Sequence, residues 1–369
     1  MTLLFFLVPV IIWLLFAKFW LKHDFSLKEL GVQAVLSIIV LAGLFWASDR
    51  IQTGSTKIVN GEVTQLRPVK KSCPVGWVTY TDDHCTDYIS RTVKVGEVCS
   101  TDSKGNRSCT DVTEIQYNYT YPWERRYFVD TDIDHVFEIK RVDGQGVFTP
   151  PRFSSIQIRD PVSREVFYKN YIRAAVNTLF KAGEAEIVET RYPRVFDYYN
   201  LNRVIYDGVT TTPADLNEWN KSVAYMNRDL RGIGANVIIV VTDKPEAYAD
   251  GLAFTWGGHN INDVVVTIGM ADNENNISWV DVRSWSAQSL VNVQIKDAIT
   301  KIGMLDHDRI NEAIMTAVNA GYTLQDMEAF SYLKDDISLP VTTIILALMM
   351  ILVFTPLITF YFARHVDWR

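Results

Sequence analysis

The sequence lacks the short motifs that identify the commonest nucleophilic and nucleotide-dependent enzymes. It contains no G-x-S-x-G, no G-x-x-x-x-G-K-[ST] and no H-E-x-x-H pattern. It also has no excess of basic residues, because 36 Lys and Arg are outnumbered by 43 Asp and Glu, which gives a formal net charge of −7. Phosphate backbones are bound by clustered cations. These absences argue against a serine hydrolase, a P-loop enzyme, a zincin protease and a nucleic-acid-binding protein.

Charge is also missing from two of the three long apolar runs that flank a polar central block. Neither residues 30–47 nor residues 339–363 contain Asp, Glu, Lys, Arg or His. About 20 apolar residues are needed to cross the ~30 Å hydrocarbon core of a bilayer. We therefore expect three transmembrane helices, at residues 1–22, 27–48 and 338–363. Ionisable groups within a membrane mark ion pathways and proton relays, so their absence indicates anchors rather than a transporter.

The charges that flank these runs predict an orientation. Short loops rich in Lys and Arg remain on the cytoplasmic side, and such residues flank the runs at Lys18, Lys22, Arg364 and Arg369. We therefore expect an inner (plasma) membrane protein with a cytoplasmic C-terminus and with residues 49–337 periplasmic or extracytoplasmic. A cleaved signal peptide is the alternative for the first run, although no basic residue precedes it.

Small residues in the apolar runs predict how the helices pack. Gly43 lies in the second run, and Thr343 and Ala347 lie in the third. Small side chains allow membrane helices to approach closely. We therefore expect the three helices to form one compact bundle, with Gly43 at a close contact.

The four cysteines lie close together in the sequence, at Cys73, Cys85, Cys99 and Cys109. An even number of cysteines in an extracytoplasmic segment predicts disulfides. Sequential pairing, Cys73 with Cys85 and Cys99 with Cys109, is favoured because a polar turn sequence separates the last two. A zinc site that includes His84 is the alternative, but neither pair has the short spacing typical of structural zinc ligands.

The central block divides into two parts of different character. Residues 50–150 contain aromatic and β-branched stretches separated by polar turns, which predicts a β-rich, disulfide-bonded domain. After Pro150 and Pro151, helical patterns alternate with apolar strands, so residues 151–336 are expected to form an α/β domain. The apolar spacing over residues 164–181 predicts the first of its helices.

Part of this second domain resembles the TPM domain family of thylakoid-lumen and related proteins. The similarity covers residues 210–325 and is carried by the segments 234–242 (GANVIIVVT), 248–249 (YA), 254–258 (FTWGG) and 262–268 (NDVVVTI). The resemblance implies an α/β domain displayed outside a membrane on a helical anchor. It also implies cation or phosphate binding at two places, where this chain departs from the family pattern. Val264 stands where a glycine is usual, and residues 283–286 (RSWS) replace a glycine-rich stretch.

Three carboxylates are spaced for a common face. If the backbone is extended, Asp130, Asp132 and Asp134 point to the same side. Calcium takes such oxygen ligands readily, so a Ca²⁺ site is one interpretation. The alternative is an acidic edge that is solvated or paired with Arg125 and Arg126.

A second carboxylate set lies in the α/β domain. Asp263 and Asp281 occupy expected strand positions, and residues 306–308 (DHD) lie between two expected helices. Together they suggest a divalent-cation site that activates water on a phosphate ester. The simpler interpretation is that Asp306 or Asp308 caps the following helix.

The sequence as a whole favours a membrane-anchored, non-enzymatic scaffold. Such a protein has the lipid bilayer as one partner and other proteins, or copies of itself, as the second; nucleic acid is not expected. The alternatives are a cation-dependent phosphohydrolase and a calcium-binding sensor in the TPM-like domain. Apart from Ca²⁺, the sequence suggests no cofactor.

Overall fold

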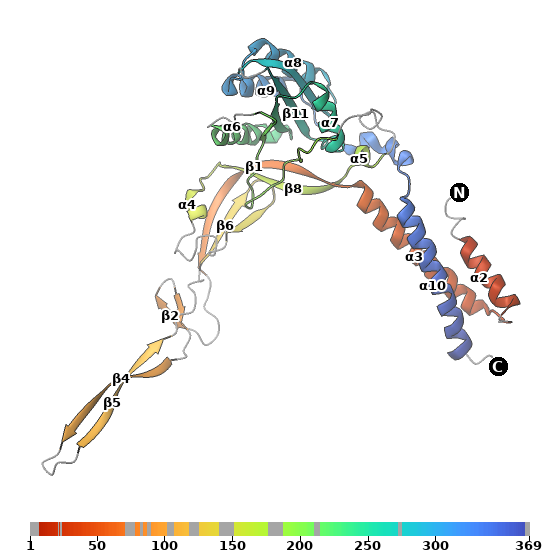
Figure 1. The fold of residues 1–369 in the computed structure, drawn as a ribbon, viewed down its shortest axis with the longest axis horizontal. Coiled ribbons are helices and arrows are strands. Elements are labelled where there is room, and N and C mark those ends of the chain that lie inside the picture. The colour runs from red at the N-terminus through yellow and green to blue at the C-terminus, as the bar shows by residue number, and fades with distance from the viewer. Residues whose placement is uncertain are drawn as a thin grey trace.

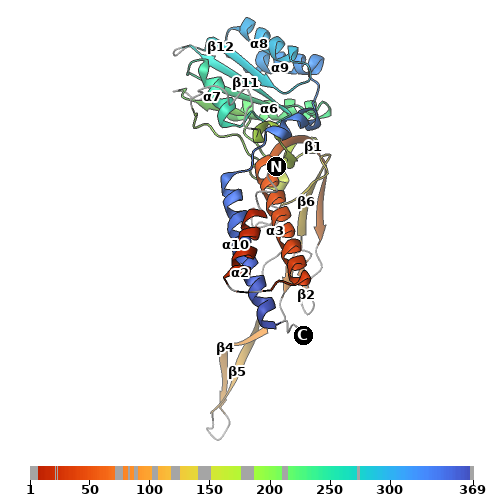
Figure 2. The ribbon, with the colours of Figure 1, turned by 90° about the vertical axis from the view of Figure 1, so that its right-hand side faces the viewer.

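The molecule has an α/β body from which a group of helices and a hairpin arm extend in different directions (Figure 1). The hairpin arm is formed by β4 (Ser90–Thr101) and β5 (Arg107–Tyr117). Seen from the side, the helices and the arm both lie below the body (Figure 2). The computed structural model describes residues 7–20, 22, 24–70, 78–81, 84–86, 90–101, 107–117, 125–139, 151–175, 187–209, 215–271 and 275–365.

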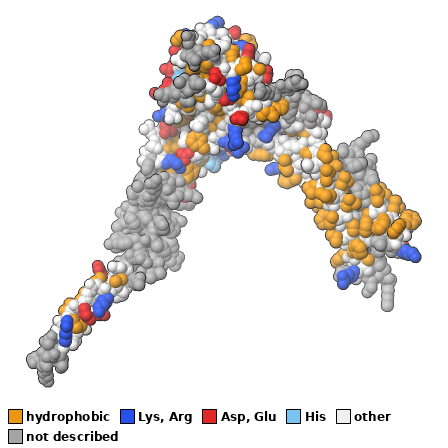
Figure 3. All heavy atoms as spheres, in the orientation of Figure 1, with side chains coloured by type: hydrophobic (Ala, Val, Ile, Leu, Met, Phe, Trp, Pro, Cys, Tyr) orange, Lys and Arg blue, Asp and Glu red, His pale blue; other side chains and the backbone are white. Residues whose placement is uncertain are grey.

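Two helices, α3 (Leu27–Thr53) and α10 (Val341–His365), are long and apolar enough to cross a membrane. Only 11% of the apolar window in α3 and 17% of that in α10 is buried inside the protein, whereas a core helix is mostly buried. Hydrophobic side chains instead cover the surface of this region (Figure 3). A third helix, α2 (Leu7–Phe19), is apolar but shorter. The structure therefore confirms two apolar helices of spanning length, and α3 extends past its expected end at residue 48.

The helices α3 and α10 pack around the buried residues Leu41, Ala347 and Ile351. The space beside Gly43 is open, with nothing within 4 Å of a Cβ built there. The prediction of a close contact at Gly43 is therefore wrong, because α3 presents Leu41 rather than Gly43 to α10.

Side-chain hydrogen bonds join these helices at both ends. Near the body, Thr343 Oγ1 donates to Ser48 Oγ at 3.3 Å. At the far end, Trp13 Nε1 of α2 and Gln33 Nε2 of α3 donate to Thr359 Oγ1 of α10, at 3.1 and 3.0 Å. Thr359 thus links all three helices.

An antiparallel sheet begins where α3 ends, because Thr53 is followed directly by the first strand residue, Gly54. The sheet has the order β7-β6-β1-β8, with strands β1 (Gly54–Lys70), β6 (Arg125–Thr131), β7 (Val136–Ile139) and β8 (Pro161–Lys169). The long strand β1 pairs with β8 over residues 54–62 and with β6 from Val63 onward. The sheet therefore takes strands from both sides of the boundary expected between residues 150 and 151.

The predicted helix over residues 164–181 is not formed. Residues up to Lys169 belong to β8, and the described residues that follow form the short helix α5 (Tyr171–Ala174). The sequence Val166, Phe167 and Tyr168 favours a strand, and pairing with β1 satisfies its backbone groups. Residues 176–186, where the predicted helix would continue, lie outside the described residues.

The second sheet is mixed and forms the centre of the body. Its order is β12-β11-β10-β9, with β9 (Val204–Asp207), β10 (Asn236–Thr242), β11 (Asp263–Met270) and β12 (Ile277–Ser284). The strands β9, β10 and β11 are parallel, and β12 runs antiparallel to β11. Every residue of β10 is buried, as expected of a parallel strand covered on both faces.

Helices cover both faces of this sheet. One face packs against three helices, α6 (Leu216–Asp229), α8 (Leu290–Ile302) and α9 (His307–Gly321). The other packs against α7 (Ala247–Thr255) through Tyr248 and Leu252. Three short helices complete the described helices: α4 (Pro151–Ser155), η3 (Leu230–Gly232) and η4 (Met327–Asp336). The α/β layering predicted from the sequence is therefore present.

The β-rich region contains two further hairpins. One is formed by β2 (Val78–Thr81) and β3 (His84–Thr86), and the other is the hairpin arm. A disulfide joins Cys99 to Cys109 across the arm, which confirms this predicted pair and removes both thiols as zinc ligands. The predicted Cys73–Cys85 pair lies outside the described residues and side chains.

Candidate functional site

Two of the three aspartates expected on one face, Asp130 and Asp132, have separate partners. Asp130 is paired with Arg67, which donates to it from Nη2 at 2.6 Å and also from Nε. These hydrogen bonds hold the pKa of the Asp130 carboxyl below its ordinary value. Asp132 accepts from Glu62 N at 2.7 Å and pairs with Arg231 Nε at 2.9 Å.

Strand β6 ends too early to place Asp130, Asp132 and Asp134 on one face, because that prediction requires an extended backbone over all three residues. Because β6 stops at Thr131, Asp132 and Asp134 lie in a turn, where Asp134 has a φ of 49°. The three carboxylates consequently do not converge. In the described part of the chain, the group of three potential metal-ligating side chains close enough to share an ion is Glu97, Cys99 and Cys109, and its cysteines form the disulfide.

The structure also separates Asp263 from Asp281. Asp263 begins β11, whereas Asp281 pairs in register with Thr267, farther along that strand. Asp281 forms an ion pair with Arg283 at 2.7 Å. The two carboxylates therefore form no common cation site.

The residues 306–308 serve the helix that they precede. Asp306 caps α9, accepting from Arg309 N at 3.1 Å, as the simpler interpretation predicted. His307 stacks on Trp219 with ring centroids 3.9 Å apart and lies 3.2 Å from Asp215. This loop is thus a structural element of the α6–α9 packing.

Asp263 belongs to a buried network where the two sheets meet. It is fully buried and accepts three hydrogen bonds, from Asn236 Nδ2 at 2.9 Å, Tyr192 OH at 3.1 Å and Asn260 N at 2.8 Å. Burial raises the pKa of Asp263 to about 6, against the opposing effect of these hydrogen bonds. The acid is thus held by neutral donors.

The network extends across the junction through Asn60 of β1. Asn60 Nδ2 donates to Asn236 Oδ1 at 3.0 Å, and Asn60 Oδ1 accepts from Arg203 Nη2 and Ser163 Oγ, both at 2.7 Å. Burial lowers the pKa of Arg203 to about 10, so this residue remains a cation at neutral pH. A second link is made by Asn262 Nδ2, which donates to Ile58 O at 2.7 Å. These residues hold the sheets together.

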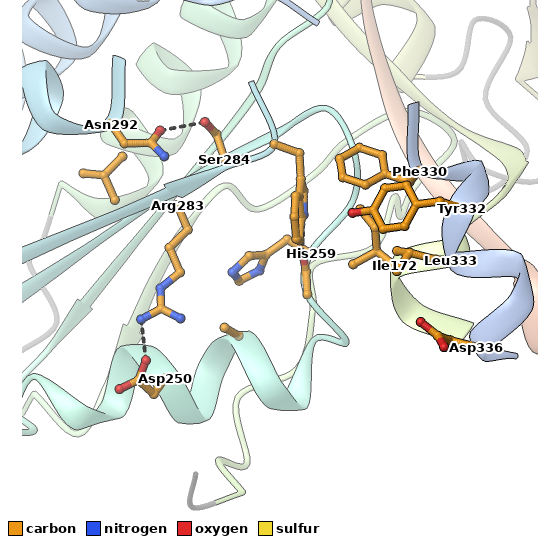
Figure 4. A pocket seen from close by; sticks show the side chains of 14 residues that line it. Ile172, Asp250, His259, Arg283, Ser284, Asn292, Phe330, Tyr332, Leu333 and Asp336 are labelled. Carbon is orange, nitrogen blue, oxygen red and sulfur yellow. Dashed lines mark hydrogen bonds and ion pairs between the residues drawn. The ribbon is translucent and has the colours of Figure 1, made fainter. Parts of the chain in front are cut away.

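A cavity lies on another side of the body, between α7, the end of β12 and η4. It has a volume of about 610 Å³, within the range of small-ligand sites. Figure 4 shows the side chains that line it, which come from α5, α7, α8, β12, η4 and the loop after α7. The sequence analysis did not identify this cavity, because its walls come from segments that are distant in the chain.

His259 is the unusual residue of this cavity. Its side chain is only 6% exposed, and neither ring nitrogen has a hydrogen-bond partner in the structure. Burial, assisted by the charge of Arg283, lowers the pKa of His259 to about 3, so the imidazole is neutral at physiological pH. Figure 4 shows its ring directed toward Arg283.

The backbone before the cavity adopts a rare conformation. Gly257, Gly258 and His259 have consecutive φ values of 63°, 84° and 63°. A left-handed backbone is easily adopted by glycine but disfavoured for a residue with a Cβ. The turn is held by Trp285 Nε1, which donates to Gly258 O at 2.5 Å. Non-glycine residues in such conformations cluster at binding and catalytic sites.

The polar side chains Ser284 and Arg283 of the cavity are engaged by their neighbours. Ser284 donates to Asn292 Oδ1 at 2.6 Å and has no hydrogen bond to His259 (Figure 4), so it is not an activated nucleophile. Arg283 is paired with both Asp281 and Asp250, at 2.7 and 2.6 Å. The remaining wall is largely aromatic and aliphatic. Phe330 packs edge-on against Trp285, with their ring centroids 5.5 Å apart.

Comparisons with protein-family models, with curated proteins and with solved structures find no match to this chain. The TPM-like interpretation therefore rests on the sequence motifs alone. In the structure, its two expected binding places lie at the same end of the mixed sheet, where Val264 pairs with Ser284.

Proposed function

We propose that this protein is a membrane-anchored, non-enzymatic scaffold whose ectodomain self-associates outside the inner membrane. In this proposal α2, α3 and α10 all span the bilayer, with the C-terminus cytoplasmic. The hydrogen bond from Trp13 to Thr359 packs α2 against α10. This contact supports a first helix that stays in the membrane with the other two, rather than a cleaved signal peptide. The basic flanks described above support the orientation.

The observation that carries the proposal is the free-standing hairpin arm. Among the described strands, β4 and β5 pair only with each other, so both outer edges are open. A lone two-stranded hairpin is marginally stable in water. Unpaired edges and uncovered faces are also what a β-element uses to bind another chain.

The two faces of the arm differ in character. Val98 lies opposite Thr110, and Val112 is two residues farther along the same strand, so both valines share one face. Their side chains are 64% and 42% exposed. The opposite face carries the disulfide and Lys94, which forms ion pairs with Glu97 and Asp111. Both faces are exposed, and the second also carries Ile115, which is 53% exposed. The valine face differs in lacking this cluster of ion pairs.

A second copy of the chain is the partner that fits this face. Most soluble protein oligomers are built from copies of a single chain. Copies anchored in one bilayer with the same orientation hold their arms at the same height, which raises the effective concentration of one arm near another. The valines present no charge that would select a partner of opposite sign.

Replacing Val112 and its neighbour Thr113 by the same acid tests the proposal. Successive strand residues point to opposite faces, and both side chains are exposed. Val112→Asp is expected to convert an oligomer in lipid nanodiscs or mild detergent to monomer, whereas Thr113→Asp should leave it intact. Native mass spectrometry measures both. A monomeric wild type, or equal behaviour of the two variants, would contradict the proposal.

The two alternative functions receive less support. A phosphohydrolase needs a catalytic cluster, but Asp263 and Asp281 lie apart, and Asp263 is enclosed by hydrogen bonds. A calcium sensor based on Asp130 and Asp132 meets a similar difficulty, because each is already paired with an arginine.

A further inference from the structure

The cavity next to His259 has unsatisfied hydrogen-bonding capacity within a hydrophobic enclosure. A buried polar group without a partner is costly, and such groups are rare in folded proteins. A neutral imidazole carries one N–H donor and one acceptor nitrogen, and neither is used in His259. A ligand amide can accept from the N–H of the ring or donate to its acceptor nitrogen, and would thereby satisfy one of the two.

The charges around the cavity select against anions. Among the described residues that line it, Arg283 is the cation, and its guanidinium is already paired with Asp250 and Asp281. Asp336 adds a further carboxylate from η4 (Figure 4). Asp250 is 66% exposed. The accessible charge is therefore negative, so a phosphate or carboxylate is repelled and a cation is attracted.

The rest of the wall is apolar. Ile172 and Leu333 are buried, and Phe330 and Tyr332 extend the same wall from η4 (Figure 4). Aromatic and aliphatic walls with few polar groups are typical of sites that enclose an apolar side chain. Tyr332 is 67% exposed, so this wall continues to the entrance.

We propose that this cavity binds a short segment of a partner protein, taking an apolar side chain against Phe330 and Leu333, its backbone amide beside His259, and an adjacent basic residue near Asp250 and Asp336. The inference goes beyond the proposed function, because it uses neither the hairpin arm nor self-association. The bound segment would lie against η4, from which the chain continues into α10.

The test uses the full-length protein in lipid nanodiscs and three probes. Acetyl-Phe-Lys-amide carries the expected features, acetyl-Phe-Glu-amide reverses the charge, and inorganic phosphate represents a simple anion. Saturation-transfer NMR detects weak binding of each. We expect the Lys peptide to bind at least tenfold more tightly than the Glu peptide, and phosphate not to compete with it.

Variants connect the binding to the cavity. His259→Phe keeps an aromatic ring at this position but removes both ring nitrogens. It should weaken binding of the Lys peptide at least tenfold without lowering the thermal midpoint of the protein. His135→Phe, at an exposed histidine outside the cavity, is the matched control. Tyr332→Ala changes an exposed wall residue, so it tests the site even if His259→Phe does not fold, and it should weaken binding severalfold.

Three results would overturn the proposal. The first is no transfer to either peptide at millimolar concentration. The second is a preference for the Glu peptide or phosphate. The third is unchanged Lys-peptide affinity in both His259→Phe and Tyr332→Ala. None of these results bears on the oligomeric state, so the scaffold proposal is tested separately.

Discussion

The Asn60 side chain connects the two sheets of the molecule. Through one amide it contacts Arg203 and Ser163 on one side and Asn236 on the other. It thereby joins the sheet that follows α3 to the sheet at the centre of the body. Buried polar networks are stabilising only when every member is satisfied, so the junction is sensitive to the loss of one partner.

Asn60→Ala is expected to lower the free energy of unfolding by about 3 kcal/mol, because it leaves the buried Arg203 cation and Asn236 with fewer partners. Thermal unfolding in nanodiscs measures the change. Asn202→Ala, at an exposed asparagine, should change stability by less than about 0.5 kcal/mol. Similar effects of the two substitutions would show that the network contributes little.

Asp263 makes stability depend on pH in the unusual direction. Its folded pKa of about 6 lies above the ordinary value of 3.8, so between these values the folded state binds more protons than the unfolded state. The stabilisation that Asp263 contributes to the folded state is therefore fully present below about pH 4 and is lost as the pH rises through 6. The titratable groups that face it are Tyr168, Tyr192 and Tyr322, and burial raises the pKa of each, so these neighbours stay uncharged over this pH range.

Asp263→Asn removes this titration. Relative to wild type, the variant should gain up to about 3 kcal/mol between pH 4 and pH 7, at roughly 1.4 kcal/mol per pKa unit. The thermal midpoints of both proteins across this range provide the measurement. Asp297→Asn, on the exposed side of α8, should follow wild type. A constant difference between wild type and Asp263→Asn at all pH values would refute the assignment.

At the scale of elements, the hairpin arm owes its order to its disulfide. The strands β4 and β5 have no third strand among the described elements, and the bond between Cys99 and Cys109 closes a short loop with a sequence separation of 10. Closing such a loop typically contributes about 2–3 kcal/mol, mainly by restricting the unfolded chain.

Replacing both Cys99 and Cys109 by serine should unfold the arm locally. Limited proteolysis is expected to cut within residues 90–117 at least tenfold faster, while the thermal midpoint of the body remains unchanged. Ser100→Ala with Ser108→Ala, at a neighbouring cross-strand pair, is the control. Equal protease resistance of the cysteine variant would mean that the strands alone hold the arm.

Local sequence patterns were sufficient for the elements whose partners are close in the chain. The alternation of apolar runs and helical patterns predicted β10, β11, β12 and the helices around them, and the Cys99–Cys109 hairpin followed from a turn between two cysteines. Charge-free apolar runs likewise predicted α3 and α10. In each case the signal lies within a few tens of residues.

Features that depend on contacts between distant segments of the chain could not be predicted from local sequence patterns. The segment after residue 160 has helical and strand-like spacing at once, and only its pairing with β1 decides for a strand. Asn60, Arg203 and His259 are individually unremarkable in the sequence. Their burial depends on three or more segments meeting, so no local pattern marks them. A paired Asp130 was expected, and its partner among the described side chains is Arg67 on the neighbouring strand; the side chains of Arg125 and Arg126 lie outside those described.

At the scale of the whole molecule, the proposed topology places every described strand on one side of the membrane. Alkaline phosphatase, which is active only outside the cytoplasm, tests this in a bacterial host. A fusion after Arg369 or after Asp24 should be inactive, because both points are expected inside. A fusion after Gly208, within the body, should be active. The reverse pattern would overturn the orientation, and activity after Asp24 would show that α2 carries the connector to the outside, against the proposed topology.

The direct passage from α3 into β1 has a consequence for how the chain is made. The central strand of the antiparallel sheet leaves the ribosome immediately behind a membrane helix, yet its partner β8 ends only at Lys169. At translation rates of roughly 5–20 residues per second, the edge of β1 that pairs with β8 stays open beside the bilayer for roughly 5–20 s. The hairpin arm, whose strands are neighbours in the chain, can fold during that interval. Synthesis therefore favours an order in which the arm forms first and the sheet that supports it closes last.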